Sequence, residues 1–130
     1  MNKITKALIS VSDKTNLETI LNELKKYNIN YYIFEMTDFK SLNKIYNSID
    51  LYIVASRIEG GPQAIMECAI TKTPIISTDV GIASEILSTK SIFNMNNFKN
   101  AEPDTEYAYK NSLKFTIPEG FKKYRDLLEH

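Results

Sequence analysis

The run Leu51–Ala55 most constrains how this chain can fold, because its apolar residues follow one another without a polar interruption. A continuous run of this length is typical of a strand buried on both faces of a parallel sheet. Four further segments have the composition of strands, namely Lys6–Ser12, Tyr31–Met36, Pro74–Thr78 and Ser91–Asn94. The sequence therefore predicts a sheet in which at least one strand is buried on both faces.

Segments with helical features separate these strands. Leu17, Ile20 and Leu24 recur at helical spacing after a capping residue, Asn16. Other helices are predicted from Asp38 or Ser41 through Tyr46, and at Pro62–Ile70, Ala83–Leu87, Thr105–Lys114 and Pro118–Leu128. Because strand and helix alternate, the sequence predicts an α/β fold, a three-layer sandwich with a mostly parallel sheet and helices on both faces. The polar stretch Asn94–Asp104 is predicted to be a surface loop.

Length and charge limit the possible functions. The 130 residues suit one domain, which we assign to residues 1–128. Sixteen basic residues cancel sixteen acidic ones, so the net charge gives no argument for binding nucleic acid or an anionic membrane. No apolar stretch approaches the ~20 residues that span a bilayer, which predicts a cytoplasmic protein. The last residues, 128–130, read as Leu-Glu-His, a familiar start of an expression tag, and we set them aside.

The single cysteine, Cys68, excludes an intramolecular disulfide. Its neighbours Ala64, Ile65 and Ala69 are apolar and small or branched, which predicts a buried structural residue without a reactive or metal-binding role.

The loop after Leu51–Ala55 is the strongest candidate for a ligand site. In doubly wound folds, ligands bind outside the carboxyl ends of the strands. Here Gly60 and Gly61 permit a close turn, and Pro62 suits the first position of a helix. The free N–H groups of that helix start could hold a diphosphate or sugar hydroxyls. The alternative is that helix starts of this kind occur in every α/β fold and most bind nothing.

Two glutamates flank this turn. Glu67 follows it in a helix whose other residues are apolar, so we expect the helix to be buried nearly all round and the carboxylate to need a partner. Ribose hydroxyls would satisfy its acceptor oxygens. Alternatively, Glu67 is structural and is held by Arg57 or a backbone amide. Glu59 lies before the turn, where a solvated loop charge is the ordinary alternative.

The segment Glu59–Pro62 with Glu67 resembles the Glu-x7-Glu motif of family-4 glycosyltransferases. The similarity continues upstream in Leu42–Val54 and Ser56-Arg57, and downstream in Thr73–Gly81 and Glu85-Ile86. It therefore covers about residues 42–87 in one ordered series. A weaker similarity to the opening of inosinate cyclohydrolase is limited to Lys6–Thr15, and that family's phosphate loop is absent from the sequence that follows.

The resemblance to family-4 glycosyltransferases implies a GT-B architecture, in which two Rossmann-like domains enclose a cleft. This chain would be the carboxy-terminal domain, which binds the nucleotide-sugar donor. The family transfers the sugar with retention and needs neither a cofactor nor a divalent metal. By motif, Glu59 would be the catalytic residue beside the donor sugar, and Glu67 would bind the ribose. The rest of the implied donor site consists of Arg57, Gly60, Gly61, Gln63 and Ala64.

Two departures from the family pattern limit the expected activity. The acceptor, a glycan or a lipid-linked sugar in polysaccharide biosynthesis, would need an amino-terminal domain that this chain lacks. The family's diphosphate-binding Arg/Lys pair is not found upstream; Arg57, Lys14 and Lys40 are the nearby cations, and none lies in the right motif. We therefore expect the isolated chain to be inactive, and any membrane association to come from other parts of a full protein. The alternative is a non-catalytic α/β module or a degenerate donor domain that acts as a partner subunit.

Overall fold

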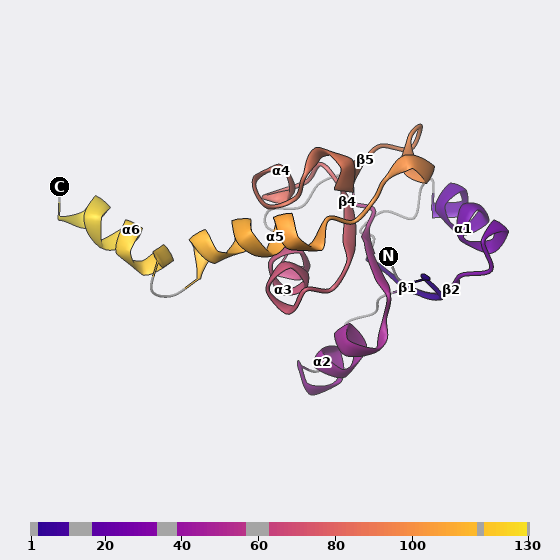
Figure 1. The fold of residues 1–130 in the computed structure, drawn as a ribbon, viewed down its shortest axis with the longest axis horizontal. Coiled ribbons are helices and arrows are strands. Elements are labelled where there is room, and N and C mark those ends of the chain that lie inside the picture. Colours follow the sequence, from indigo (N-terminus) through magenta and orange to yellow (C-terminus); the bar gives the residue numbers. More distant parts are fainter. Residues whose placement is uncertain (1–2, 11–16, 34–38, 57–62, 117–118, 130) are drawn as a thin grey trace.

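The computed structural model describes residues 3–10, 17–33, 39–56, 63–116 and 119–129. Within these residues the chain forms one five-stranded sheet in the order β2-β1-β3-β4-β5, in which every neighbouring pair is parallel (Figure 1). The strands are β1 (Lys6–Ser10), β2 (Asn30–Ile33), β3 (Leu51–Val54), β4 (Ile75–Thr78) and β5 (Ile92–Phe93). The predicted parallel α/β sheet is confirmed, and this order is one of the two common doubly wound arrangements of the Rossmann-like class.

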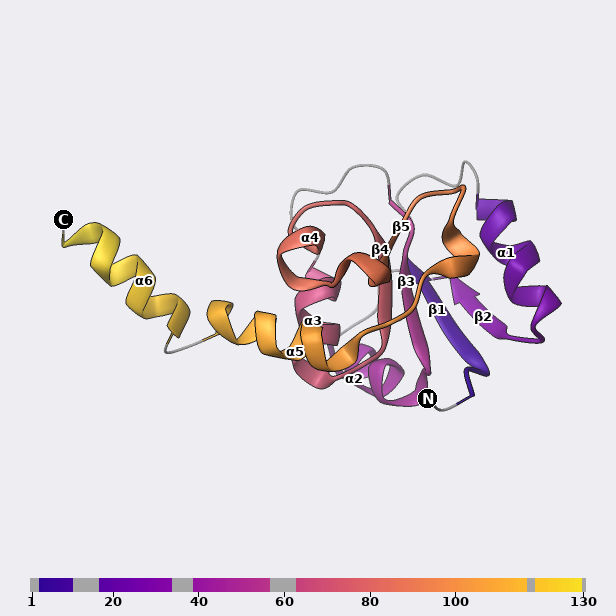
Figure 2. The same cartoon turned by 45° about the horizontal axis from the view of Figure 1, so that its top comes forward.

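Helices cover both faces of the sheet, which gives the predicted three layers. The helices that cover the sheet are α1 (Leu17–Lys26), α2 (Phe39–Ser48), α3 (Gln63–Thr71), α4 (Ala83–Ile86) and α5 (Thr105–Ser112), and α6 (Glu119–Leu128) follows them at the end of the chain. Figure 2 shows α1 on one side of the sheet and α3 and α4 on the other, with α5 beside them. Side chains of α2, α3, α4 and α5 share one core cluster with the sheet, and side chains of α1 share the second.

The alternation of side chains along the strands explains these two cores. Tyr52 and Val54 point to the face covered by α2 and α3, whereas Leu51 and Ile53 point to the face covered by α1. All four residues of β3 are buried. A strand that is apolar on both faces can be satisfied only between two helix layers, so the composition of β3 accounts for its central position.

Several boundaries differ from the prediction. The strand expected to begin at Tyr31 begins at Asn30, and the expected ends of the strands Lys6–Ser12 and Tyr31–Met36 lie outside the described residues. The helix expected at Thr105–Lys114 ends at Ser112 and continues as a 3₁₀ turn over Leu113–Phe115. Such tightening of the last turn is common at helix ends.

The prediction of a plain surface loop at Asn94–Asp104 is wrong at one residue. Phe98 lies in a 3₁₀ turn, η2 (Phe98–Asn100), and only 7% of it is exposed. Its ring meets Phe93 of β5 edge-on, with ring centroids 5.0 Å apart. Met95 and Ala101 pack against the same cluster, so the apolar residues of this stretch cover the outer strand on the face of α1.

The helix α6 lies beyond the end of α5, away from the sheet (Figures 1 and 2). Its residues Leu127 and Leu128 are largely exposed. Across the described ranges, no helix combines the length and apolar character needed to cross a bilayer.

Candidate functional site

The inner strands β3 and β4 and the helix α3 that connects them frame the candidate site. β3 pairs in parallel with β4 through Tyr52–Ile75, Ile53–Ile76 and Val54–Ser77. The expected arrangement, two inner parallel strands with Glu67 on the helix between them, is confirmed. In a parallel sheet such a helix begins near the carboxyl end of the first strand, which is the edge where ligands bind in this fold class.

The carboxyl ends of β3 and β4 are tied together by a side chain. The hydroxyl of Thr78, at the end of β4, donates to the carbonyl oxygen of Ser56 at 2.6 Å. On the other side of β3, the Ala55 amide donates to the carbonyl oxygen of Ser10 at 2.9 Å. These bonds fix the path of the backbone where it leaves β3.

Three of the seven predicted site residues fall in the described part of the chain. Gln63 is exposed in the first position of α3, Ala64 is partly exposed, and Glu67 is half-buried one turn further on. Residues four apart share one face of a helix, so Gln63 and Glu67 point to the same side. The other predicted residues, Arg57, Glu59, Gly60 and Gly61, lie outside the described residues.

The expectation that α3 is buried nearly all round is wrong. Ile65, Cys68 and Ala69 are buried, but Gln63 is exposed and Ile70 is 44% exposed. The sheet and the neighbouring helices cover one stripe of α3, so apolar residues at the remaining positions stay accessible. Glu67 lies beside this covered stripe, and its carboxylate therefore avoids the full cost of burial.

The described partner of Glu67 is Tyr46, which the sequence reasoning did not name. The Tyr46 hydroxyl, on α2, donates to Oε2 of Glu67 at 2.6 Å. Bonds of this length are typical when a hydroxyl donates to a charged carboxylate. The two residues lie 21 positions apart on different helices, so no local pattern in the sequence signals their contact.

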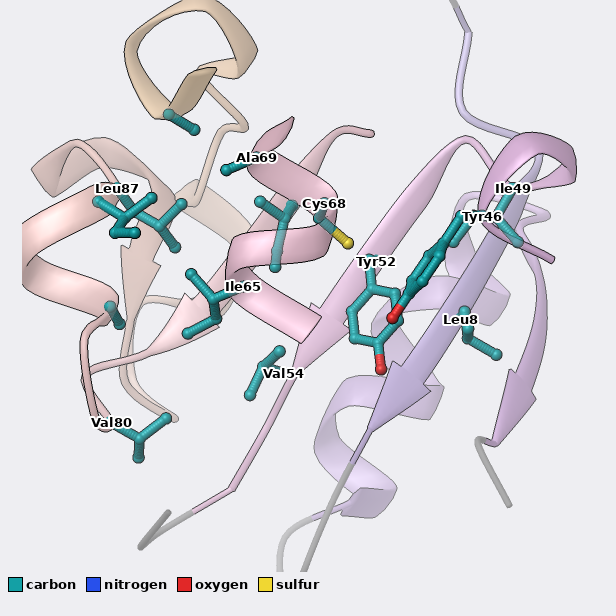
Figure 3. Close-up of a cluster of buried hydrophobic side chains, with 14 residues drawn as sticks. Leu8, Tyr46, Ile49, Tyr52, Val54, Ile65, Cys68, Ala69, Val80 and Leu87 are labelled. Atoms are coloured by element: carbon teal, nitrogen blue, oxygen red, sulfur yellow. The ribbon is translucent and has the colours of Figure 1, made fainter. Parts of the chain in front are cut away.

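Tyr46 is held in place by the core. It is 7% exposed, and its ring lies against Tyr52 of β3 with centroids 5.7 Å apart. Figure 3 shows the two rings side by side in the cluster that also contains Cys68 of α3. Burial, and next the hydrogen bond to Glu67, raise the pKa of Tyr46 far above its usual range. The phenol therefore stays protonated and acts as the donor.

Cys68 is fully buried, as predicted. Burial raises the pKa of its thiol far above the usual range, with a smaller effect from the charge of Glu67. A protonated, inaccessible thiol is a poor nucleophile, so Cys68 fills space in the core. Among the described residues, no group of three or more His, Cys, Asp or Glu side chains is arranged to hold a metal ion.

A concave region lies in another part of the described chain, away from α3. An open hollow of about 450 Å³ is lined by residues at the α1–β2 connection and along β2, namely Lys25, Asn28, Ile29, Asn30, Tyr31 and Tyr32. It includes the amino end of β2, whereas ligands in this fold class bind at the carboxyl ends. The hollow therefore does not belong to the candidate site on α3.

The fold and the site define a class of protein: a doubly wound α/β domain in which a mostly apolar helix with one glutamate follows an inner strand. The sequence matches the family described as Glycosyl transferases group 1 over residues 3–106, and the chain belongs to that family. The match contains the whole segment of about residues 42–87 that carried the resemblance. No curated protein sequence matches the chain significantly. Membership of the family supports glycosyl transfer as the general activity.

Proposed function

We propose that this chain is the nucleotide-sugar-binding domain of a retaining, cytoplasmic glycosyltransferase of polysaccharide biosynthesis. The nucleotide sugar is the substrate, and no cofactor or metal takes part. The acceptor, a glycan or a lipid-linked sugar, binds to an amino-terminal domain, and without that domain the chain does not turn over substrate. The observation that best supports the proposal is the half-buried Glu67 carboxylate on α3, within a chain of the glycosyltransferase family.

The chemistry of α3 suits a nucleotide sugar. A carboxylate can accept several hydrogen bonds, and a ribose presents adjacent hydroxyl donors. The N–H groups in the first turn of a helix favour an anion such as a diphosphate. In this arrangement Glu67 binds the ribose, and Glu59 lies beside the transferred sugar as the catalytic residue. The remaining proposed contacts come from Arg57, Gly60, Gly61, Gln63 and Ala64.

The test is a calorimetric titration of the chain with ADP, GDP and UDP. We expect one of them to bind, and Glu67→Gln to weaken that binding by about tenfold, because a charge-assisted hydrogen bond is replaced by a neutral one. Glu106→Gln is a matched control, because Glu106 is an exposed carboxylate on α5. Equal affinities of the wild type and Glu67→Gln would assign Glu67 a structural role. A chain that binds none of the nucleotides would be a non-catalytic module or a degenerate donor domain.

The same titration with the corresponding nucleotide sugars separates the two glutamates. Glu59→Ala should leave the affinity for the bare nucleotide nearly unchanged and remove the additional affinity that the sugar provides. In a full-length enzyme this change should reduce turnover strongly, because a group beside the reacting carbon acts mainly in the transition state. Parallel losses for nucleotide and nucleotide sugar would contradict the catalytic assignment.

A further inference from the structure

The hydrogen bond between Tyr46 and Glu67 joins a buried residue to the residue proposed to bind the ribose. We propose that Tyr46 is a positioning residue for nucleotide binding: its hydroxyl holds one oxygen of the Glu67 carboxylate, so that the carboxylate meets the ribose hydroxyls in a fixed orientation. This inference rests on the proposed function. It adds a residue that determines how strongly the site prefers ribose to 2′-deoxyribose.

The position of the Tyr46 hydroxyl is set by the core. The ring packs at 40° to that of Tyr52, which is 1% exposed in the central strand β3. Ile49 of the segment after α2 and Leu8 of β1 belong to the same cluster. A tyrosine has only two side-chain torsions, and close packing leaves it few orientations. The hydroxyl is thus a rigid donor anchored to the sheet.

The hydrogen bond from Tyr46 restricts the orientation of the Glu67 carboxylate. A half-buried glutamate on a helix has several torsions that must be fixed when a ligand binds, and fixing them costs affinity. The bond from Tyr46 fixes them beforehand, since it attaches Oε2 to a rigid partner at 2.6 Å. Binding groups held in place before the ligand arrives give higher affinity and sharper discrimination.

The direction of this bond selects the chemistry of the ligand. Tyr46 keeps its proton because burial raises its pKa, so it donates and the Glu67 carboxylate accepts. An ionised carboxylate has acceptor sites left on both oxygens and no donor of its own. Its remaining sites therefore suit hydroxyl groups and repel phosphate oxygens. A pair of ribose hydroxyls meets that requirement, and a 2′-deoxyribose meets it only in part.

The experiment compares ribonucleotide with 2′-deoxyribonucleotide binding. The 130-residue chain is titrated with ADP, GDP and UDP and with their 2′-deoxy forms, and the ratio of the two affinities is measured for wild type and Tyr46→Phe. We expect the ratio to fall by about threefold or more in Tyr46→Phe, because one of the bonds that orient the carboxylate is lost. Tyr31→Phe, which removes a hydroxyl from a half-buried tyrosine on the opposite face of the sheet, should leave the ratio unchanged. A purely structural role of Tyr46 would weaken both nucleotides equally and would overturn the inference.

A double-mutant cycle provides a second readout. If Tyr46 acts through Glu67, then Tyr46→Phe should not change the ratio further in a Glu67→Ala background, where the group that Tyr46 holds is missing. An additional loss of selectivity there would contradict positioning through Glu67. Thermal unfolding of each variant shows whether it is folded.

The outcomes separate this inference from the proposed function. If Glu67→Gln lowers the affinity for nucleotides and Tyr46→Phe leaves the ribose preference unchanged, the proposed nucleotide site is supported and the positioning role of Tyr46 is contradicted. If the wild-type chain binds none of the six nucleotides, or binds them with no dependence on Glu67, the proposed function fails and the positioning role fails with it.

Discussion

The strands β2 and β3 lie on either side of β1 and pair with it in matching register, but their side chains differ in burial. Both β2 and β3 pair in parallel with β1, and Ile9 is aligned with Ile33 on one side and with Ile53 on the other. Yet Ile53 is fully buried, whereas Ile33 is 39% exposed. The difference arises because β3 has a further strand beyond it and helices over both faces, whereas β2 is the edge of the sheet.

The buried inner strands should contribute more to the free energy of unfolding than the edge strand β2, and the proposed site lies beside the inner strands. The inner strands β3 and β4 connect through α3, which carries the proposed site, and one face of α3 packs against the sheet in a core cluster. The outer strand β2 leaves Tyr32 57% exposed, beside the open hollow at the α1–β2 connection. A site that depends on accurate positioning is best built on the rigid side.

The largest effect that we predict tests this contrast directly. Ile53→Ala should lower the free energy of unfolding by about 2–5 kcal/mol, because it removes a buried side chain from a closely packed core. Ile33→Ala, on the same face and in the same row, should cost less than about 1 kcal/mol because the side chain is partly exposed. Urea unfolding of both variants measures the two losses. Equal losses would show that the edge strand is as well packed as the central one.

A smaller effect should follow from breaking the tie between the ends of β4 and β3. Thr78→Val removes the hydroxyl that donates to the Ser56 carbonyl oxygen at 2.6 Å, with little change in shape. We expect a loss of about 1–2 kcal/mol in the free energy of unfolding, because the carbonyl loses its donor in a partly buried region. Thr116→Val is the matched control, since its hydroxyl donates to the Leu113 carbonyl oxygen in an exposed turn outside the sheet. Similar losses in both variants would mean that the tie adds nothing specific to the inner strands.

The sequence predicted the fold better than it predicted the surroundings of the site. The apolar run of β3 and the helical spacing of Leu17, Ile20 and Leu24 are local patterns, and both elements formed where expected. The sequences of β2 and β3, Asn-Tyr-Tyr-Ile and Leu-Tyr-Ile-Val, are both rich in residues that favour strands. Which of them becomes the edge depends on the order of strands in the sheet, and that order is not a local property.

The candidate site shows the same division. The position of Glu67 on a helix was predicted from Pro62 and the apolar residues that follow it, but its partner Tyr46 lies on another helix. The exposure of Ile70 was missed because composition alone does not say which stripe of a helix is covered. Sequence reasoning thus identifies the elements and the motif, and the structure adds the contacts between elements.

The smallest predicted effect concerns how the start of β1 is held by its two neighbours. On the side of β3, Asp50 Oδ2 accepts bonds from the Thr5 amide at 2.9 Å, the Thr5 hydroxyl at 2.8 Å and the Lys6 amide at 3.0 Å. On the side of β2, the Asn30 amide donates to the Thr5 carbonyl oxygen at 2.9 Å. The first attachment contains a titratable group and the second does not.

Acid should therefore weaken the hydrogen bonds of Asp50 on the β3 side of β1 and leave the Asn30–Thr5 bond on the β2 side unchanged. The Thr5 amide, then the Thr5 hydroxyl and the Lys6 amide, hold the pKa of Asp50 below its usual value. A lowered pKa contributes stability that is complete above the unfolded-state pKa, about 4, and is lost as the pH falls through the lower folded-state value. Asp50 is partly exposed, so the effect on global stability should be smaller than that of Thr78→Val.

Hydrogen exchange near neutral pH and below pH ~4 measures this difference at single amides. In the wild type, the protection factors of the Thr5 and Lys6 amides should fall on acidification, while that of the Asn30 amide stays constant. In Asp50→Asn the Thr5 and Lys6 amides should be less protected already at neutral pH and should change little with acid, because the titrating group is gone. If all three amides lost protection together, acid would be opening the whole edge of the sheet, and the contrast between the β2 and β3 sides of β1 would not extend to its first residues.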